Sequence, residues 1–509
     1  MSGRLDIMIF SMPQLFLDRI PGAPAVLKAA VETAGFTCRT ADLSIDFFVN
    51  EAGRNINTYD RMSKIFRPSE MIDEESTKAA DSWIERNIRK IKELNPRTIG
   101  ISVFTLYQHR ATYLLASAIR KECPDISIIL GGMGLNISCS SMSNLINLSK
   151  TQILDPFHIF MRKKKLCDEV ILGVSGYGGL VEVMERLIGE RKAHDINQAT
   201  AKTTLFRSPI PNYDDYTLED YIWPETPAVP ITGSRGCVRQ CTFCDVPGQF
   251  GRFSIRTGTD VAEEMLYLSE RYNIRKFEFT DSLVNGSLKA FKDWMTVVAE
   301  YNDNHPPEKR ITWFGQYITR PQKEVPTELY DLMRRSGVVN LVIGVESGSD
   351  RILDSMKKKI KVKDVHDELA MFYKHDIKTH FLVFSGFYNE TQESFKETLK
   401  FAVDCQRYVA NGTITKFSVG PPLFINSTTY LYDHAEDLGI ELDPYDDTNW
   451  RYAENPEYDV ITRIFNRIVQ QSLTDQLGFP FAGQGISVLH QLNHKLKELE
   501  SDLEGELNG

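Results

Sequence analysis

Short apolar runs alternate with segments of helical periodicity over the first 195 residues of the chain. The runs predict strands and the periodic segments predict helices. The strands are expected at residues 5–10, 36–43, 98–104, 126–130 and 170–173, and the helices at 23–34, 108–121 and 180–188. This alternation is typical of a doubly wound parallel sheet, so we predict a Rossmann-like, flavodoxin-type α/β domain over residues 1–195.

A second alternating series follows a linker at 196–227, which contains prolines and few aliphatic residues. Its strands are expected at 231–233, 276–280, 311–314, 341–345, 379–384 and 416–419. Its helices are expected between them, for example at 261–271, 327–336, 350–356, 363–374 and 393–405. Six β/α units can curve into a partial TIM-type barrel, predicted over residues 228–445. Residues 446–509 are predicted to form a helical C-terminal extension with an amphipathic tail.

One long segment between the expected strands of the first domain has no assigned element. It covers residues 133–167 and carries the basic run Arg162–Lys165, so we expect a solvated loop there.

The totals indicate a globular protein of two or three domains. Of the 509 residues, 42% are hydrophobic and 25% are charged. The net charge of −10 argues against nucleic acid as a partner. No apolar run is long enough to cross a membrane, and the N-terminal run is typical of a first buried strand, not of a signal peptide. We therefore expect a cytoplasmic protein.

Three of the eight cysteines lie within eight residues, at Cys237, Cys241 and Cys244, and the other five are scattered singly. The scattered cysteines are interpreted as small buried hydrophobic residues. Three thiolates on one loop can bind one metal centre, but this is one ligand fewer than a closed zinc site or a Cys₄ cluster requires. The residues alone allow three interpretations: a zinc site with a distant fourth ligand, cysteines that share a loop by chance, or an iron–sulfur cluster with one open iron.

The spacing C-x₃-C-x₂-C, with Phe243 before the last cysteine, resembles the signature of the radical S-adenosylmethionine (SAM) superfamily. The resemblance implies a [4Fe–4S] cluster on the three cysteines, whose open iron chelates the amino and carboxylate groups of SAM. One electron from the cluster then cleaves SAM to methionine and a 5′-deoxyadenosyl radical. In such enzymes the cofactor carries the difficult chemistry and the protein positions it.

Three further segments extend the resemblance over about residues 228–445. They are FTDSLVNG at 279–286, IGVESGSD at 343–350 and FSGFYNET at 384–391, where Tyr388 and Asn389 replace the usual Pro and Gly. Taken alone, each segment also has a purely structural interpretation. Asp281 fits a turn, and the segment at 343–350 fits a buried strand that leads into a capped helix. The resemblance implies SAM contacts from Phe243, Asp281, Ser282, Gln316, Glu346, Ser347 and Gly386.

A Rossmann-like domain ahead of such a core is similar to the cobalamin-binding class of the superfamily. The resemblance implies a cobalamin site beyond the carboxyl ends of the first sheet, near Gly131, Gly132, Gly173 and Gly176. These glycines serve tight turns equally well, and the chain has no Asp-x-His-x-x-Gly motif to supply a histidine ligand to cobalt. The alternative is a degenerate domain that shapes the substrate cleft or an interface.

The resemblance implies a radical SAM enzyme that acts on a small molecule or peptide, with an external one-electron donor such as flavodoxin or ferredoxin. The leading specific reaction is cobalamin-dependent methyl transfer to carbon, and no residue is assigned to the chemical step. The alternatives are radical rearrangement, cyclisation or oxidation without cobalamin, or a non-catalytic iron–sulfur or zinc-binding protein.

Overall fold

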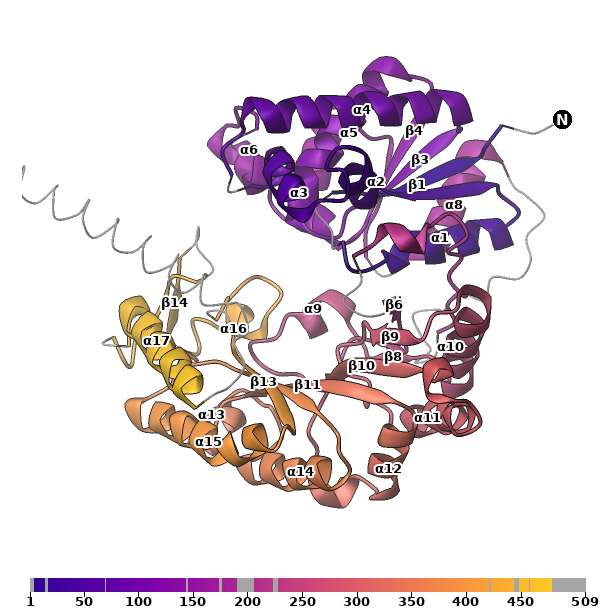
Figure 1. The fold of residues 1–509 in the computed structure, drawn as a ribbon. Helices are drawn as coiled ribbons and strands as arrows, with labels where there is room; N and C mark the ends of the chain where they lie inside the picture. Colours follow the sequence, from indigo (N-terminus) through magenta and orange to yellow (C-terminus); the bar gives the residue numbers. More distant parts are fainter. Residues whose placement is uncertain are drawn as a thin grey trace, which may run out of the picture. The chain divides into compact units, whose positions relative to one another are not determined.

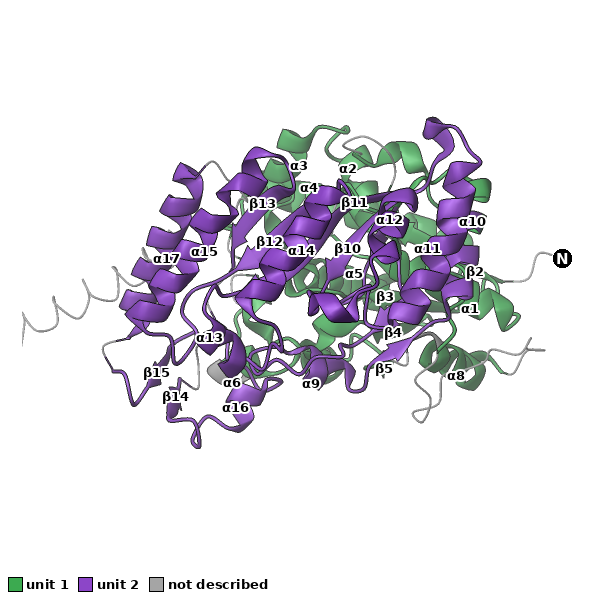
Figure 2. Cartoon of the chain, turned by 90° about the horizontal axis from the view of Figure 1, so that it is seen from below, with its two compact units in different colours: residues 1–230, 267–276 green, residues 231–266, 277–509 purple. Residues whose placement is uncertain are grey.

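The computed structural model describes residues 4–13, 17–68, 70–142, 145–173, 176–189, 206–222, 228–420, 423–443, 448–456 and 458–477. The chain forms two compact units, whose elements are labelled in Figure 1 and which are coloured separately in Figure 2. Unit 1 consists of Met1–Pro230 with Tyr267–Lys276, and unit 2 consists of Ile231–Leu266 with Phe277–Gly509.

Unit 1 is built on a five-stranded parallel sheet. In spatial order its strands are β2 (Cys38–Asp42), β1 (Ile7–Ser11), β3 (Thr98–Ser102), β4 (Ser127–Gly131) and β5 (Glu169–Ile171). Every residue of β1 is buried, as expected of a central strand that is covered on both faces. The order β2-β1-β3-β4-β5 is that of flavodoxin-type folds, which confirms the predicted Rossmann-like domain.

Helices cover both faces of this sheet (Figure 1). Helices α1 (Gly22–Thr33) and α8 (Gly176–Ile188) contact each other. Val31 of α1 and Met184 of α8 lie in one buried apolar cluster with Ile9 of β1. Between β2 and β5 the chain forms α2 (Leu43–Asn50), α3 (Ile56–Met62), α4 (Glu74–Leu94), α5 (His109–Glu122), α6 (Lys150–Leu154) and α7 (Phe157–Lys163).

The segment between β4 and β5 is not the solvated loop that the sequence led us to expect. It contains α6 and α7, and Phe157, Phe160 and Met161 of α7 are buried. Their spacing places them on one side of the helix, while the basic run Arg162–Lys165 is exposed. The four consecutive basic residues at 162–165 suggested a loop, but they lie at the C-terminal end of α7, a helix whose other side is apolar.

Unit 2 carries a six-stranded sheet whose strands lie side by side in chain order. From one edge to the other they are β13 (Ile414–Val419), β12 (Thr379–Val383), β11 (Val338–Glu346), β10 (Thr312–Tyr317), β9 (Lys276–Phe279) and β6 (Ala228–Ile231). The strands from β10 to β13 pair in parallel. The connecting helices are α10 (Gly258–Tyr272), α11 (Leu288–Asp303), α12 (Glu328–Arg335), α13 (Asp350–Ser355), α14 (Val362–Lys374) and α15 (Gln392–Ala410). This arrangement is the predicted partial TIM-type barrel.

The strands of this barrel bury one face and leave the other more open. On β10, Trp313 and Tyr317 are buried and Gln316 is exposed. Its register partner on β11, Val342, is half-buried, whereas the next residue, Ile343, is buried. Because successive side chains point to opposite faces of a sheet, Gln316 and Val342 share the open face.

The chain after β13 forms α16 (Tyr430–Asp433), an antiparallel hairpin of β14 (Ile440–Leu442) and β15 (Trp450–Tyr452), and then α17 (Val460–Gln476). The predicted helical extension is therefore wrong at its start, where Trp450 of β15 is buried in an apolar cluster. The expected amphipathic tail lies outside the described residues. No helix among the described residues is long and apolar enough to cross a membrane.

Candidate cluster and cofactor site

The three clustered cysteines lie on the loop between β7 (Ser234–Arg235) and α9 (Val246–Phe250). Thr242, in the middle of this loop, donates its backbone N–H to the carbonyl of Met356 at 3.0 Å. Its own carbonyl accepts the N–H of Leu431 at 3.1 Å. The loop is thereby fixed to the end of α13 and to the start of α16.

Two of the three sulfur atoms receive backbone N–H groups. The N–H of Arg239 donates to Cys237 Sγ at 3.3 Å, and the N–H of Val246 donates to Cys244. Burial raises the pKa of Cys241 and raises that of Cys244 to about 12. These thiols therefore hold their protons until a metal supplies positive charge, and the N–H donors then stabilise the thiolates.

The described residues contain no group of three His, Cys, Asp or Glu side chains that could hold a metal ion as they stand. A closed zinc site requires four ligands that converge on one ion. In an iron–sulfur cluster the cysteines bind different iron atoms, and hydrogen bonds to their sulfurs tune the cluster. Three cysteines on one loop, two of them with N–H donors, fit a cluster with one open iron.

A half-buried ion pair lies beside the cysteine loop. Lys358 Nζ is 2.8 Å from Glu346 Oε1, and it also lies 5.8 Å from the centre of the Phe243 ring. Burial alone would lower the pKa of Lys358, but the Glu346 carboxylate and, when they are ionised, the thiols of Cys241 and Cys244 together raise it above its ordinary value. Lys358 therefore remains a cation, and its charge in turn lowers the pKa of Cys241.

Glu346 has a left-handed backbone conformation at the end of β11, with φ of 72°. The register of β11 with β12 shifts between Gly344 and Glu346. The carboxylate folds back over Gly344, where an added Cβ would lie 2.1 Å from Glu346 Oε1. Such strain in a residue other than glycine is typical of functional sites.

Phe243 connects the cysteine loop to the end of β12. Its ring meets those of Phe384 and Phe387 edge to face, with centres 5.5 Å and 6.4 Å apart. Phe384 begins the segment in which Gly386 was expected to contact SAM. Gly386 has φ of 97° and donates its N–H to Glu390 Oε2 at 2.8 Å.

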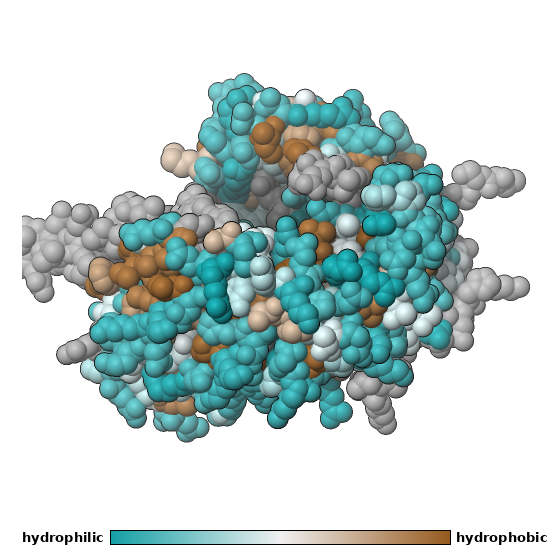
Figure 3. Space-filling view, turned by 60° about the horizontal axis from the view of Figure 1, so that its bottom comes forward, coloured by the Kyte–Doolittle hydropathy of each residue, from teal (hydrophilic) through white to brown (hydrophobic). Residues whose placement is uncertain are grey.

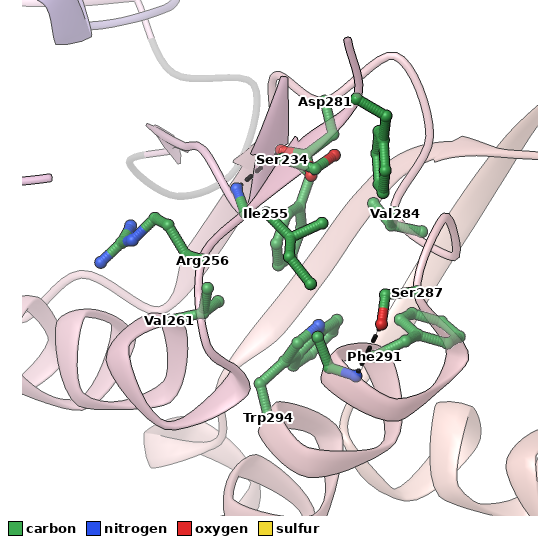
Figure 4. A pocket seen from close by; sticks show the side chains of 13 residues that line it. Ser234, Ile255, Arg256, Val261, Asp281, Val284, Ser287, Phe291 and Trp294 are labelled. Carbon is green, nitrogen blue, oxygen red and sulfur yellow. Dashed lines mark hydrogen bonds between the residues drawn. The ribbon is translucent and has the colours of Figure 1, made fainter. Parts of the chain in front are cut away.

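The carboxylate of Asp281 is fully engaged by the chain. It accepts the N–H of Gly233 at 2.7 Å and the hydroxyl of Ser234 at 2.6 Å, next to a small pocket lined by Phe291 and Trp294 (Figure 4). Burial raises the pKa of Asp281 to about 7. In this geometry Asp281 holds the start of the cysteine loop, and the neighbouring Ser282 is half-buried.

Ser347 is likewise engaged within the chain. Its hydroxyl lies 3.0 Å from Thr398 Oγ1 and accepts the N–H of Ser349 at 3.1 Å. The structure therefore brings together Phe243, Glu346 and the cysteines, and it places Asp281 and Ser347 in supporting positions.

Sequence reasoning missed two residues of this site. Lys358 stands between Lys357 and Lys359, both of which have left-handed φ values, and three consecutive lysines suggest only a solvated surface. Glu390 is buried and hydrogen-bonded to Tyr458, 68 residues away in the chain. The glutamate of the segment FYNET was a usable signal for Glu390.

In unit 1, the glycines of the expected cobalamin site have different surroundings. Gly132 has φ of 111°, and a Cβ there would lie 2.2 Å from the carbonyl oxygen of Val103, so it serves the close approach of two loops. A Cβ at Gly131 would meet only the carbonyl oxygen of Ile171, at 3.9 Å, and one at Gly173 would project into open space. Gly176 is the first residue of α8.

Large apolar side chains are exposed beyond the carboxyl ends of three neighbouring strands of this sheet. Phe104 follows β3, Met133 follows β4 and Leu172 follows β5, and they are 56%, 43% and 41% exposed. Ligands of doubly wound folds bind at this edge. Exposed apolar groups gathered at one edge are typical of a binding surface.

Residues 231–402 match the sequence model of the Radical SAM superfamily, and they include the cysteine loop, Glu346 and Lys358. The chain therefore contains a radical SAM domain, and enzymes of that superfamily use a [4Fe–4S] cluster and SAM. Its N-terminal domain has the fold found in the cobalamin-binding class of that superfamily.

Two relatives align with much of the chain. An uncharacterized methyltransferase of Pyrococcus horikoshii is 27% identical over 329 residues, which cover 61% of this chain and 65% of the relative. The anaerobic magnesium-protoporphyrin IX monomethyl ester cyclase of Cereibacter sphaeroides is 22% identical over 423 residues, which cover 82% of this chain and 62% of the relative. The chain thus spans less than two thirds of the length of either relative.

Solved structures of the radical SAM methyltransferase TsrM from Kitasatospora setae share the fold. The complex with tryptophan and a SAM analogue has a TM-score of 0.60 and 18% identity, and covers 90% of this chain and 82% of TsrM. The complex with cobalamin and a [4Fe–4S] cluster has a TM-score of 0.55 and 16% identity, and covers 87% of this chain and 80% of TsrM.

Proposed function

We propose that this protein is a radical SAM enzyme in which Cys237, Cys241 and Cys244 hold a [4Fe–4S] cluster. The observation that carries the proposal is the cysteine loop itself, with N–H donors to two sulfurs and the cation of Lys358 beside Cys241. When bound, the cluster supplies the electron that cleaves SAM. The substrate is a small molecule or peptide, and an external donor such as flavodoxin or ferredoxin supplies the electron.

The chain's own residues position SAM in this proposal. Phe243 offers a backbone and ring surface to the adenine, and Glu346 offers a carboxylate to the ribose hydroxyls. Lys358 fixes that carboxylate by the 2.8 Å ion pair. Gln316, exposed on the open face of β10, adds a polar contact. Asp281 does not contact SAM directly in this proposal. It holds the start of the cysteine loop through its hydrogen bonds to Gly233 and Ser234.

We further propose that unit 1 binds cobalamin and that the reaction is methyl transfer to carbon. Phe104, Met133 and Leu172 form an apolar surface at the sheet edge, and Gly131 and Gly173 leave room for close approach. The proteins named above support this choice, because one relative and the TsrM structures are methyltransferases and TsrM binds cobalamin. A cobalamin in unit 1 would supply the methyl group.

Oxidative cyclisation is the second candidate reaction. The observation that favours it is the alignment with the anaerobic cyclase of Cereibacter sphaeroides over 82% of this chain. Methyl-labelled SAM distinguishes the two reactions, because the label enters the product only when a methyl group is transferred.

Anaerobic incubation of the iron-loaded protein with SAM and a reductant tests the shared first step. We expect 5′-deoxyadenosine from the wild-type protein and none from the Cys241→Ala variant, which lacks a cluster ligand. The Cys123→Ala variant is the matched control, because Cys123 lies outside the cysteine loop, and it keeps the activity. An iron-loaded wild-type protein that forms no 5′-deoxyadenosine would refute the proposal.

A further inference from the structure

Helix α17 is polar on its buried side. Its buried residues are Arg463, Ile464, Asn466, Arg467, Gln470 and Thr474. Ile461 and Phe465 are 45% and 62% exposed, and apolar side chains gather on the outer surface at this end of unit 2 (Figure 3). A helix that only packs on its domain has the opposite pattern. Because α17 contacts β13 and α15, its polar side is turned into the unit.

The first arginine of this side is fully paired. The Arg463 guanidinium lies 3.6 Å from the centre of the Trp450 ring. It donates to the carbonyls of Tyr458 at 3.1 Å and of Trp450 at 3.0 Å. Arg463 therefore has a structural role, because it connects α17 to β15.

Arg467, one turn later, has no hydrogen-bond or ion-pair partner among the described residues. It is 1% exposed, and none of its three guanidinium nitrogens has a hydrogen-bond partner among the described residues. Gln470, on the same side of the helix, leaves both its side-chain nitrogen and oxygen without partners in the described part of the chain. Burial lowers the pKa of Arg467 to about 10, with no contribution from a carboxylate. Buried polar groups are nearly always paired, and an unpaired buried cation is strongly unfavourable.

We propose that Arg467, together with Gln470, binds an oxyanion of the substrate, either a carboxylate or a phosphate. The inference rests on the proposed function and adds to it the chemical class of the substrate. A guanidinium is a planar fork that binds such groups through two parallel N–H···O bonds. Gln470, which offers a donor and an acceptor, can complete the contact. In the proposed function the open iron chelates the carboxylate of SAM, and Lys358 is paired with Glu346, which leaves Arg467 for a second molecule.

Position within unit 2 supports this assignment. Gly386, in the segment proposed to contact SAM, lies against the side chain of Arg463, one turn before Arg467. The unpaired guanidinium therefore belongs to the same part of the barrel as a proposed cofactor contact. Barrel active sites assemble at the ends of the strands, from residues of several segments.

Thermal unfolding of the full-length, cluster-loaded protein in sodium phosphate and in sodium succinate, at constant ionic strength, tests the proposal. We expect the Tm of the wild-type protein to rise saturably by about 2–4 °C with one of the two anions, and the more effective anion identifies the group. The Arg467→Met variant should lose this rise, and its Tm without anion should equal or exceed that of the wild type. Arg467→Lys, which keeps the charge and loses the fork, should need about tenfold more anion.

Arg334→Met is the control, because the Arg334 side chain is 54% exposed and pairs with Asp331. This variant should show the same rise in Tm with the anion as the wild type. A wild-type protein without the rise, a rise that persists in Arg467→Met, or a lower Tm of that variant without anion overturns the proposal. A fall in SAM affinity in Arg467→Met would assign the oxyanion to SAM and overturn the substrate assignment. The Tm response does not depend on 5′-deoxyadenosine formation, so failure of the proposed function is seen separately.

Discussion

Glu346 and Lys358 are the residues in which charge, burial and backbone strain coincide. The left-handed backbone of Glu346 costs about 1–3 kcal/mol, and its 2.8 Å ion pair with Lys358 over the side-chain-free Gly344 compensates for it. Removal of either charge would leave the other half-buried and without its partner. The ion pair therefore holds the Glu346 carboxylate in one position, which suits the proposed contact with the ribose of SAM.

Replacement of Glu346 with Gln tests this role. We expect SAM affinity to fall about tenfold or more, because a charge-assisted hydrogen bond is lost, while the iron content stays unchanged. Anaerobic equilibrium dialysis with labelled SAM measures the first quantity and a colorimetric iron assay the second. Glu441→Gln, at an exposed position of β14, is the control. Unchanged SAM affinity would show that the assignment of Glu346 is wrong.

Asp281 makes the stability of the protein depend on pH. Its pKa is about 7 in the folded chain, because burial disfavours the charge, and about 3.9 in the unfolded chain. The folded state therefore binds more protons between these values, and the stability from this group is complete below about pH 4 and is lost as the pH rises towards 7. We expect the Tm of Asp281→Asn, relative to the wild type, to be higher at pH 8 than at pH 5.

Scanning calorimetry at the two pH values measures this change. The exposed Asp437→Asn serves as control and should show no such trend. Because Asp42, Glu368 and Glu390 also have raised pKa values, the comparison uses the difference between variant and wild type. An equal difference at both pH values would contradict the burial of a protonated Asp281.

At the scale of elements, the bulge at the end of β11 sets the position of Glu346. A Cβ at Gly344 would lie 2.1 Å from Glu346 Oε1, so Gly344→Ala should displace the carboxylate and reduce SAM affinity about as much as Glu346→Gln does. The iron content should not change, because the cysteine loop is a separate segment. At Gly100, in β3, the nearest atoms to an added Cβ lie at an ordinary 3.5 Å. Gly100→Ala should therefore bind SAM normally, and equal binding by both variants would argue against this role of the bulge.

The sequence was most informative where a pattern is local. The strands of both sheets were predicted to within a few residues, because each is a short apolar run between helical segments. The 21 residues of α4 were missed, since the helix buries alanines and Trp83 beneath a mostly polar sequence. The cysteine loop was found from spacing alone.

Residues whose role depends on tertiary contacts could not be identified from the sequence. Lys358 meets Glu346 only because β11 and the turn after α13 pack together, and Glu390 meets Tyr458 across 68 residues. Asp281 and Ser347 lie just after β9 and β11, as the sequence predicted, and their contact with SAM stays a prediction. Their hydrogen bonds, which decide between a ligand contact and a backbone support, follow from packing.

At the scale of the whole molecule, the proposed cobalamin of unit 1 distinguishes the two candidate reactions, methyl transfer to carbon and oxidative cyclisation. We expect the protein to bind hydroxocobalamin, with a spectrum that lacks histidine ligation, because no Asp-x-His-x-x-Gly motif is present. Leu172→Glu should weaken binding about tenfold or more by placing a charge on the apolar edge. Leu94→Glu is matched in exposure, at 42% against 41%, and should bind normally. A histidine-ligated spectrum would contradict the ligand-free model, and no binding would remove the support for methyl transfer through cobalt.

The proposed metal centre is a [4Fe–4S] cluster on three cysteines whose open iron binds SAM. The most direct measurement is the electron paramagnetic resonance spectrum of the reduced, anaerobically purified protein, with and without SAM, together with its metal content. We predict about four irons per chain, a [4Fe–4S]⁺ signal that changes when SAM is added, and no signal from Cys241→Ala. Stoichiometric zinc without iron would rule out the iron–sulfur cluster, and a cluster signal that SAM leaves unchanged would rule out SAM binding at its open iron.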